Sequence, residues 1–388
     1  MKASTFVYPW DVNGDPEAPA RIAALGVAQV TLAAAYHSTR ALTPRHPRHR
    51  IVTAEHAAVL YPAGDRWEGR EPRPYPAGDW APGDAFGEAA AALAGAGLEV
   101  HTWVVLAHNS RLGAEHPGTS VVNAYGDRYP WAPCIAQPAT RAYLTDLAAE
   151  AAVRPGARGT ELESLGWYGL QHLHAHDKTG GVGLGEAGQY LMALCFCPSC
   201  REGYGRHGLD PDELATAVRA ALEPVWQGAA PSDGGWPGIE KLLGESLAHT
   251  TRAYRDDTAR TLQEQAVAAV RDAAPDGFQV LLHADPVSYH VGANPGVDPA
   301  HILSVADGVV VSCAGGTGTL TPFARQDRAG AVIAAHFPVV AGMGGSPGTL
   351  AADAAEARRQ GATELRLYHA GLASDGDLGA VRSALAGL

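Results

Sequence analysis

Residues 332–369 read VIAAHFPVVAGMGGSPGTLAADAAEARRQGATELRLYH, and this stretch contains the pattern that decides the fold. It has a short apolar run at 332–337, an alanine-rich amphipathic segment, and a second short run at 364–369. Ser346 and Pro347 are residue types that favour the N-cap and the first position of a helix. The order predicts a strand, a helix and a parallel strand, the repeating unit of α/β proteins.

The same alternation extends along the whole chain. Short apolar runs predict eight strands, at residues 6–10, 29–36, 100–107, 161–167, 279–284, 308–312, 332–337 and 364–369. Several of these runs are almost continuously apolar, which is typical of parallel strands buried on both faces. Eight strand–helix units predict a (β/α)8 TIM barrel, and no GxGxxG turn follows the first strand as a dinucleotide-binding fold would require.

The chain is longer than a barrel core needs. It has 388 residues, against about 250 for a typical (β/α)8 domain. Residues 38–84, rich in Pro, Arg and His, predict an elaborated loop after the second strand, with room for a hairpin. Residues 169–235, after strand four, contain histidine and cysteine clusters, and we expect a small helical lobe at the barrel mouth. No repeat or linker divides the chain, so we expect one domain over residues 1–388.

Composition excludes several classes of protein. A net charge of −12 disfavours a nucleic-acid partner or an anionic membrane surface. No apolar run approaches the roughly 18 residues of a membrane span, and the first residues lack the pattern of a signal peptide. Three of the five cysteines lie close together, which argues against a disulfide framework. We therefore expect a cytoplasmic protein.

Two carboxylates follow neighbouring predicted strands, at the barrel end that carries active sites. Glu163 lies in ELESLGW and Asp285 in QVLLHADP. Adjacent strands would bring the two carboxyl groups within about 5–9 Å, the span that glycosidases use. Glu163 would be the acid/base and Asp285 its partner. The alternatives are that Glu163 pairs with an arginine or caps a helix, and that Asp285 only caps the turn before Pro286.

Other polar and aromatic side chains gather at the same strand ends and predict contacts with sugar hydroxyls and sugar rings. Trp103 and Tyr36 supply further aromatic faces there, although ordinary burial explains any single ring equally well. The loop with His172, His174 and His176 fits a solvated loop, sugar contact or metal ligation. The candidate binding residues are Trp10, Asp11, His37, His108, Asn109, Trp167, His176, Asp177, His283, His336 and His369.

The cysteines Cys195, Cys197 and Cys200 form the pattern C-x-C-x-x-C. Closely spaced thiolates of this kind are typical of structural zinc sites, which need four ligands. Cys134, His207 or a histidine of the loop after strand four would complete the set. The alternative is that the three are free, buried thiols.

Three segments carry a resemblance to a known group of proteins. NAYGDRYPWAPCIAQPATRAYL at 123–144, ELESLGW at 161–167 and LCFCPSCREGY at 194–204 occur in an order that resembles uncharacterised bacterial TIM-barrel proteins of the glycoside-hydrolase type. The resemblance implies a carbohydrate-processing barrel whose strand-four acid is Glu163. Two positions depart from the large retaining clan: Leu162 replaces its strand-four Asn, and His336 stands where that clan has its strand-seven Glu.

These observations lead to three functional hypotheses. The first is a glycoside hydrolase that takes a small carbohydrate and needs no cofactor apart from a structural zinc. The second is a metal-dependent sugar isomerase, epimerase or lyase, in which Glu163, His283, Asp285 and either His336 or His369 hold a divalent cation. The third is a carbohydrate-binding protein without catalysis.

Overall fold

A closed barrel of eight parallel strands forms the centre of the computed structural model, which describes residues 1–173, 176–230 and 234–388. Each strand pairs in parallel with its neighbour, and β1 pairs with both β2 and β13, which closes the cylinder. The predicted (β/α)8 architecture is therefore confirmed. The barrel strands are β1 Lys2–Val7, β2 Gln29–Tyr36, β6 Glu99–Val105, β9 Gly159–Glu163, β10 Gln279–Ala284, β11 Gly308–Ser312, β12 Val332–Pro338 and β13 Glu364–Tyr368.

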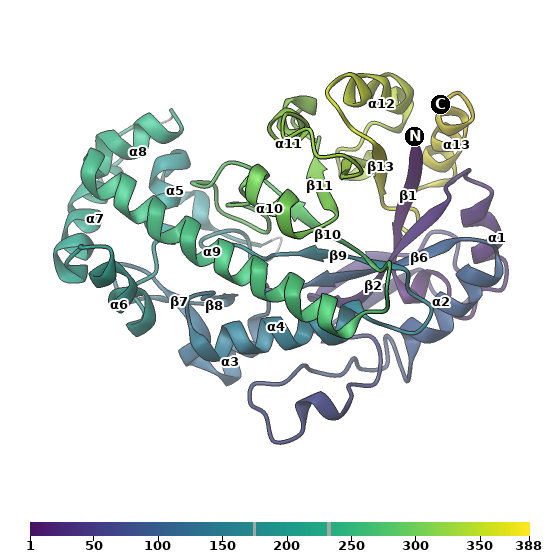
Figure 1. Ribbon diagram of the computed structural model, residues 1–388, viewed down its shortest axis with the longest axis horizontal. Coiled ribbons are helices and arrows are strands. Elements are labelled where there is room, and N and C mark those ends of the chain that lie inside the picture. Colours follow the sequence, from purple (N-terminus) through teal and green to yellow (C-terminus); the bar gives the residue numbers. More distant parts are fainter. Residues whose placement is uncertain (174–175, 231–233) are drawn as a thin grey trace.

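A helix on the outside of the barrel follows each strand (Figure 1). Local sequence explains several starts: Asp84, Asp298 and Ser374 cap α2, α10 and α13 with their side chains. The predicted start at Ser346 is a short 3-10 turn, and the α-helix begins only after it. The outer helices are α1 Ala18–Ala23, α2 Ala85–Gly95, α4 Pro138–Ala152, α9 Glu245–Ala273, α10 Pro299–Val305, α11 Thr321–Ala324, α12 Leu350–Arg359 and α13 Asp375–Ala386.

Two strands, β1 and β9, have boundaries that differ from the prediction for identifiable reasons. β1 begins at Lys2, earlier than predicted. The prediction missed its first residues because polar Ser4 interrupts the apolar pattern, although the Ser4 hydroxyl lies inside the barrel, 3.0 Å from the Thr31 hydroxyl. β1 also ends earlier, at Val7, since the 3-10 turn η1 (Pro9–Asp11) follows. β9 ends at Glu163 rather than at 167, because Ser164 has a φ of 62°, which no strand residue adopts.

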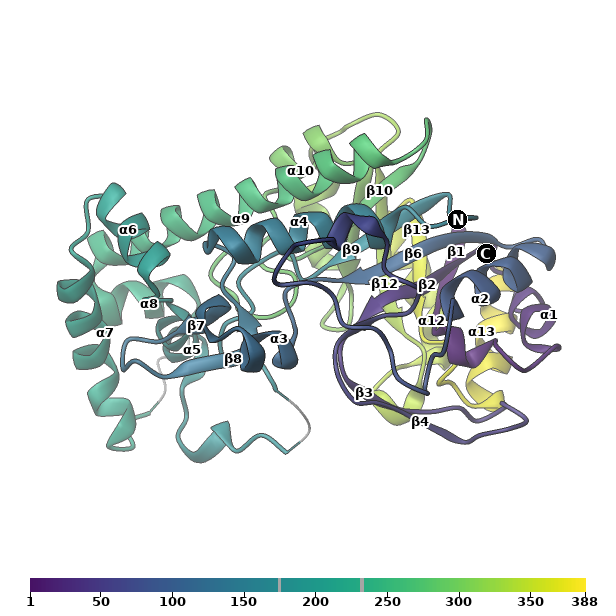
Figure 2. The same cartoon turned by 90° about the horizontal axis from the view of Figure 1, so that it is seen from below.

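The long insertions follow β2, β6 and β9. The first contains the hairpin β3 (Thr39–Leu42) and β4 (Ile51–Ala54), as the sequence allowed. Figures 1 and 2 show that α5–α8, β7 and β8 gather around one end of α9, beside the barrel. The remaining elements are β5 Ala58–Val59, η2 Asp65–Trp67, α3 Ser110–Glu115, η3 Pro117–Thr119, β7 Ser120–Val122, β8 Arg128–Pro133, η4 Thr179–Gly181, α5 Gly185–Ala193, α6 Pro198–Arg206, α7 Pro211–Trp226, α8 Trp236–Leu243, η5 Thr317–Leu320, η6 Ala341–Met343 and η7 Pro347–Thr349.

Residues 169–235 are thus helical over much of their length, as expected, although their role as a lobe at the mouth stays a prediction. His174 lies outside the described residues. Among the helices that the structure describes, none is both long and apolar enough to cross a bilayer.

A buried ion pair crosses the barrel interior. Glu161 and Arg366 are both fully buried, and Arg366 Nε donates to Glu161 Oε1 at 2.5 Å. Thr31 Oγ1 donates to the same oxygen at 3.0 Å, and Arg366 Nη1 donates to Glu364 Oε2 at 2.8 Å. Burial alone would raise the pKa of the Glu161 carboxyl, but Arg366 and then His283 lower it to about 2. Glu161 is therefore ionised, and its charge is balanced within the barrel.

Arg366→Met should destabilise the fold strongly, because it leaves the Glu161 carboxylate buried without its counter-charge. We expect the free energy of unfolding, measured by urea denaturation, to fall by about 3 to 5 kcal/mol. The double variant Glu161→Gln/Arg366→Met is the control, and it should recover much of that loss. A single variant within about 1 kcal/mol of the unaltered protein would contradict this account of the interior.

Candidate active site

A cavity of about 350 Å³ lies at the carboxyl ends of the barrel strands. All eight strands contribute to its wall, from Phe6 of β1 to Tyr368 of β13. Its size falls in the range of small-molecule sites, and it combines apolar walls with a few convergent polar groups. The lining residues are Phe6, Tyr36, His37, Trp103, Glu163, His283, Asn294, Val310, Ser312, His336, Pro338, Val340, Met343 and Tyr368.

Glu163 enters this cavity from the last position of β9. Its carbonyl accepts a hydrogen bond from Leu106 N at 3.0 Å, which continues the pairing with β6. The left-handed Ser164 then turns the chain away, and Ser164 N donates to Asn294 Oδ1 at 3.2 Å. On the side chain, Trp103 Nε1 donates to Glu163 Oε2 at 2.6 Å. The carboxyl group is thus held by backbone and side-chain contacts together.

His283 of β10 and His336 of β12 are two of the three histidines in the lining of the cavity. His283 Nε2 lies 3.4 Å from Glu161 Oε2, so this ring joins the cavity to the buried ion pair beneath it. Burial, helped by His283 and Arg366 and opposed by Glu161, lowers the pKa of His336 to about 3. His336 is therefore a neutral imidazole at physiological pH, and it can donate one hydrogen bond and accept another.

Three tyrosine hydroxyls cluster at one wall. Tyr8 OH donates to Tyr36 OH at 3.0 Å, and Tyr368 shares hydrogen bonds with both. Burial is the main cause that raises the pKa of each phenol, so all three stay protonated at neutral pH. Tyr36 and Tyr368 line the cavity and offer their ring faces and hydroxyls to a bound molecule.

A stack of rings continues from the cavity to its rim. The His37 ring lies 4.2 Å from that of Tyr36 and 4.9 Å from that of His108, and His108 stacks on Tyr168 at 4.3 Å. Burial, then His37 and His172, lower the pKa of His108 to about 3. The predicted residues His37 and His108 are therefore close together. The neighbouring Asn109 is occupied as the N-cap of α3, where its Oδ1 accepts from Leu112 N at 3.0 Å.

Asp285 lies outside the lining of the cavity. Its Oδ1 accepts from Val287 N at 2.9 Å, and its Oδ2 bonds His290 Nδ1 at 2.7 Å. Its backbone N donates to the carbonyl of Asn294 at 2.7 Å. Asp285 thus shapes the loop that carries Asn294 into the cavity, while its pairing with Glu163 stays a prediction.

Five other predicted binding residues are not part of the lining of the cavity. Trp10 and His369 are buried and stack on Tyr8, with ring centroids 4.5 and 4.3 Å away. Trp167 is buried and donates to the carbonyl of Arg255 at 3.0 Å. His176 and Asp177 do not line the cavity, and Asp177 Oδ2 accepts from Leu173 N at 2.7 Å.

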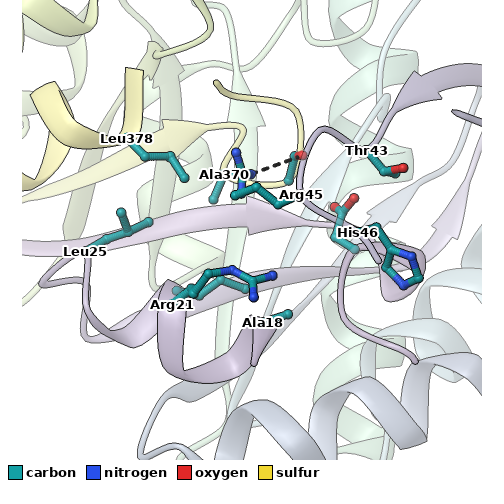
Figure 3. Close-up of a pocket in the computed structure, with 11 residues that line it drawn as sticks. Ala18, Arg21, Leu25, Thr43, Arg45, His46, Ala370 and Leu378 are labelled. Atoms are coloured by element: carbon teal, nitrogen blue, oxygen red, sulfur yellow. Dashed lines mark hydrogen bonds between the residues drawn. The ribbon is translucent and has the colours of Figure 1, made fainter. Parts of the chain in front are cut away.

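Asp11 lines a separate small cavity of about 30 Å³, shown in Figure 3. Its Oδ2 accepts from Tyr8 N at 2.8 Å, and burial raises its pKa to about 7 although that hydrogen bond and Arg45 oppose the shift. Figure 3 shows Arg45 turned towards the carbonyl of Ala370, to which it donates. The volume suits one or two water molecules rather than a sugar.

The cysteines form a compact group. Cys134 Sγ lies 3.6 Å from Cys197 Sγ, 3.5 Å from Cys200 Sγ and 3.7 Å from Cys195 Sγ, and all four residues are buried. With Zn–S bonds of about 2.3 Å, the sulfurs of a tetrahedral site lie about 3.8 Å apart. The group therefore has the donor set and the size of a structural metal site. Cys134 completes it, because His207 bonds Gly203 and Asp257 instead.

Over residues 1–173, 176–230 and 234–388, the four cysteines are the one His, Cys, Asp and Glu group compact enough to hold an ion. Glu163, His283 and Asp285, with His336 or His369, do not form a second such group in that part of the chain. The described structure thus lends no support to the divalent-metal hypothesis.

Some lining residues were missed from the sequence. Ser312 could have been found, since it is the last residue of a predicted strand and such positions face the mouth. Asn294 and Met343 sit in loops without periodic pattern, and no sequence signal places them in the cavity.

Comparison with known proteins identifies the fold but no family. No family model matches the chain, and no curated protein matches its sequence. Among solved structures, α-L-fucosidase isoenzyme 2 from Paenibacillus thiaminolyticus is similar with a TM-score of 0.61 at 13 % identity, over 100 % of this chain and 49 % of that one. This chain therefore spans about half the length of the fucosidase, and it covers 58 % of a β-galactosidase from Halorubrum lacusprofundi.

Two smaller structures match over almost their whole length. The PgaB (BpsB) glycoside hydrolase domain from Bordetella bronchiseptica has a TM-score of 0.55 at 17 % identity, covering 99 % of each chain. The catalytic domain of β-amylase from Paenibacillus polymyxa has a TM-score of 0.57 at 12 % identity, covering 99 % of this chain and 97 % of that one. This chain therefore shares its barrel fold with structures of glycoside hydrolases, and at these identities the likeness concerns the fold alone.

His336→Gln should make the protein less sensitive to acid. The pKa of His336 is about 3 in the fold, against an ordinary value of 6.5, so its contribution to stability is complete above pH 6.5 and is lost as the pH falls towards 3. Between pH 7 and 4 we expect the variant to lose about 1 to 3 kcal/mol less unfolding free energy than the unaltered protein, measured by urea denaturation. The half-exposed His249→Gln is the control. Equal acid sensitivity of the two variants would contradict the lowered pKa of His336.

Proposed function

We propose that the chain is a glycoside hydrolase in which Glu163 is the carboxyl group at the reacting bond. One observation carries the proposal: Glu163 stands at the end of the fourth barrel strand, inside a cavity walled by all eight strands. An ionisable side chain among buried rings is energetically costly unless other contacts compensate for it. A carboxyl group at this position therefore favours a functional role. The fold shared with a fucosidase, a β-amylase domain and the PgaB hydrolase domain supports the same reaction class.

The reaction needs a proton donor at the glycosidic oxygen and a surface that binds the sugar ring. Glu163 is the proposed donor, and the second carboxylate would either attack the anomeric carbon or activate the water that attacks it. Tyr36 and Tyr368 provide ring faces for the apolar side of a sugar. The neutral His336 and its neighbour His283 provide hydrogen bonds to hydroxyl groups.

Asp285 is the proposed second carboxylate, as the sequence suggested, and its contacts also support a different role. Both of its oxygens accept hydrogen bonds within its own loop, which delivers Asn294 to the cavity. To act as a reacting group, Asp285 would have to break its hydrogen bond to His290. As a loop residue it would act on catalysis through the position of Asn294.

Glu163→Gln should abolish turnover without unfolding the protein. Loss of a general acid lowers kcat by about a hundredfold to ten-thousandfold, and the amide keeps the size of the side chain. The assay is release of p-nitrophenol from a panel of aryl glycosides, and of reducing ends from oligosaccharides. Glu223→Gln, on the helix α7 of the insertion after β9, is the matched control. Full activity of the Glu163 variant would remove that residue from the mechanism, and sugar binding without turnover would indicate a binding protein.

Asp285→Asn distinguishes the two roles of Asp285. A reacting carboxylate would make this variant as inactive as the Glu163 variant, whereas a loop residue would leave part of kcat and raise KM. Asn294→Ala is the comparison, since it removes the side chain that the Asp285 loop delivers. As the second carboxylate, Asp285 should give an inactive Asp285→Asn protein while Asn294→Ala keeps part of its kcat. Partial activity in both variants would instead indicate the loop role, which the resting contacts of both Asp285 oxygens also support.

We also propose that the four cysteines hold a structural zinc ion. Bound there, zinc would join the loop after β8, through Cys134, to the start of α6, through Cys200. The cluster belongs to the insertions and contributes nothing to the lining of the active-site cavity. Its role is therefore stability, as in other closed four-cysteine sites.

Purified protein should contain one zinc per chain, measured by inductively coupled plasma mass spectrometry. Cys200→Ser should lose the metal and melt at a lower temperature, because the ligand set falls to three. Cys313→Ser is the matched control, since Cys313 is a buried free thiol outside the group. Protein from zinc-supplemented cultures that lacks metal would contradict the proposal.

A further inference from the structure

The indole nitrogen of Trp103 holds one particular oxygen of the Glu163 carboxyl. Trp103 Nε1 donates to Oε2 at 2.6 Å, a short bond of the kind that charged acceptors form. An indole N–H can only donate, so Oε2 is the acceptor in this pair. Within the described part of the chain, no hydrogen bond to Oε1 of Glu163 is found. The two carboxyl oxygens are therefore in different environments.

The ring of Trp103 is wedged among other rings and cannot follow a moving side chain. Its centroid lies 4.8 Å from that of Phe6 and 4.6 Å from that of Tyr36, both edge-to-face, and Tyr8 stacks on it at 5.9 Å. The residue is 3 % exposed. Trp103 belongs to β6, which pairs directly with β9, so the donor and the carboxyl group stand on adjacent strands.

The backbone of Glu163 is equally restricted. Leu106 N binds its carbonyl, and the next residue, Ser164, has a left-handed conformation and donates its N–H to Asn294. With the main chain and Oε2 both held, Oε1 is the oxygen left to meet a substrate.

From these contacts we propose that Trp103 is a positioning residue that assigns Oε1 of Glu163 as the proton-transferring oxygen. The inference rests on the proposed function of Glu163. In the acid step, the proton on Oε1 moves to the glycosidic oxygen as the bond from that oxygen to the anomeric carbon breaks. The anomeric carbon forms its new bond to the attacking nucleophile, which is a water molecule or the proposed second carboxylate. The bonding pair stays with the departing oxygen, and the negative charge remains on the carboxylate. The Trp103 N–H then bonds a full charge, which strengthens it and favours the step.

The hydrogen bond can be tested without any substrate. Protein labelled with ¹⁵N at its eight tryptophans gives one indole N–H signal per residue, and Trp103→Phe identifies the signal of Trp103. In Glu163→Gln a neutral amide replaces the carboxylate, so this signal should move upfield while the others stay in place. An unmoved Trp103 signal in Glu163→Gln would overturn the inference. If Trp103→Phe fails to fold, the comparison of Glu163→Gln with the unaltered protein still tests the inference, because one of the eight indole signals should move upfield and an unchanged set of eight would overturn it.

Kinetics test the consequence for catalysis. Trp103→Phe keeps a ring in the wedge and loses the donor, so kcat should fall by about tenfold to a hundredfold, the worth of a hydrogen bond to a charged group, with KM nearly unchanged. Trp67→Phe is the matched control, because Trp67 Nε1 donates to Glu150 Oε2 at the same 2.6 Å, away from the cavity. The kcat of Trp67→Phe should equal that of the unaltered protein, although its free energy of unfolding should fall about as much as that of Trp103→Phe.

The outcomes separate this inference from the function on which it rests. If Glu163→Gln is inactive while Trp103→Phe keeps a kcat within twofold of the unaltered protein, the positioning role is wrong and the function stands. If Glu163→Gln is fully active, the function fails, whatever the indole signal shows. An equal loss of kcat in Trp103→Phe and Trp67→Phe would indicate a general stability effect and would also overturn the inference.

Discussion

Barrel closure is the constraint from which the site follows. The pairing of β1 with both β2 and β13 turns an open sheet into a cylinder and brings all eight carboxyl ends to one rim. Residues as distant in the chain as Phe6 and Tyr368 thereby share one wall, with ring centroids 5.7 Å apart. No single segment could build such a cavity, because each strand supplies only one or two side chains to it.

Alternation along one strand then separates stability from chemistry. Glu161 and Glu163 are both on β9 and point to the same side, one layer apart. The lower carboxylate is fully buried and neutralised by Arg366, whereas the upper one reaches the cavity and is held by an uncharged indole. His283 lies between the two layers, 3.4 Å from Glu161 and at the cavity wall. The same residue type thus anchors the barrel at one level and supplies a reactive group at the next.

The sequence predicted the architecture well and the site in part. Apolar runs identified all eight strands, because burial of a strand on both faces leaves a strong local signal in the sequence. Glu163, His37, His283 and His336 were predicted because they stand at strand ends. Each of them lines the cavity, and their roles in catalysis or binding stay predictions. The cysteine spacing found three of the four thiols, and only folding shows that Cys134 joins them. Asp285 has the same strand-end position, and its bond from Val287 N agrees with the alternative that it caps the turn at Pro286. Its second bond, to His290, is not revealed by the local pattern.

The central claim is that the Glu163 carboxyl meets a glycosidic bond in this cavity. A crystal structure of the Glu163→Gln protein with a bound oligosaccharide tests it most directly. The account predicts sugar rings against Tyr36 and Tyr368, and a glycosidic oxygen within about 2.6 to 3.2 Å of the side chain at position 163. Sugar bound at another surface, with the cavity filled only by solvent, would contradict it.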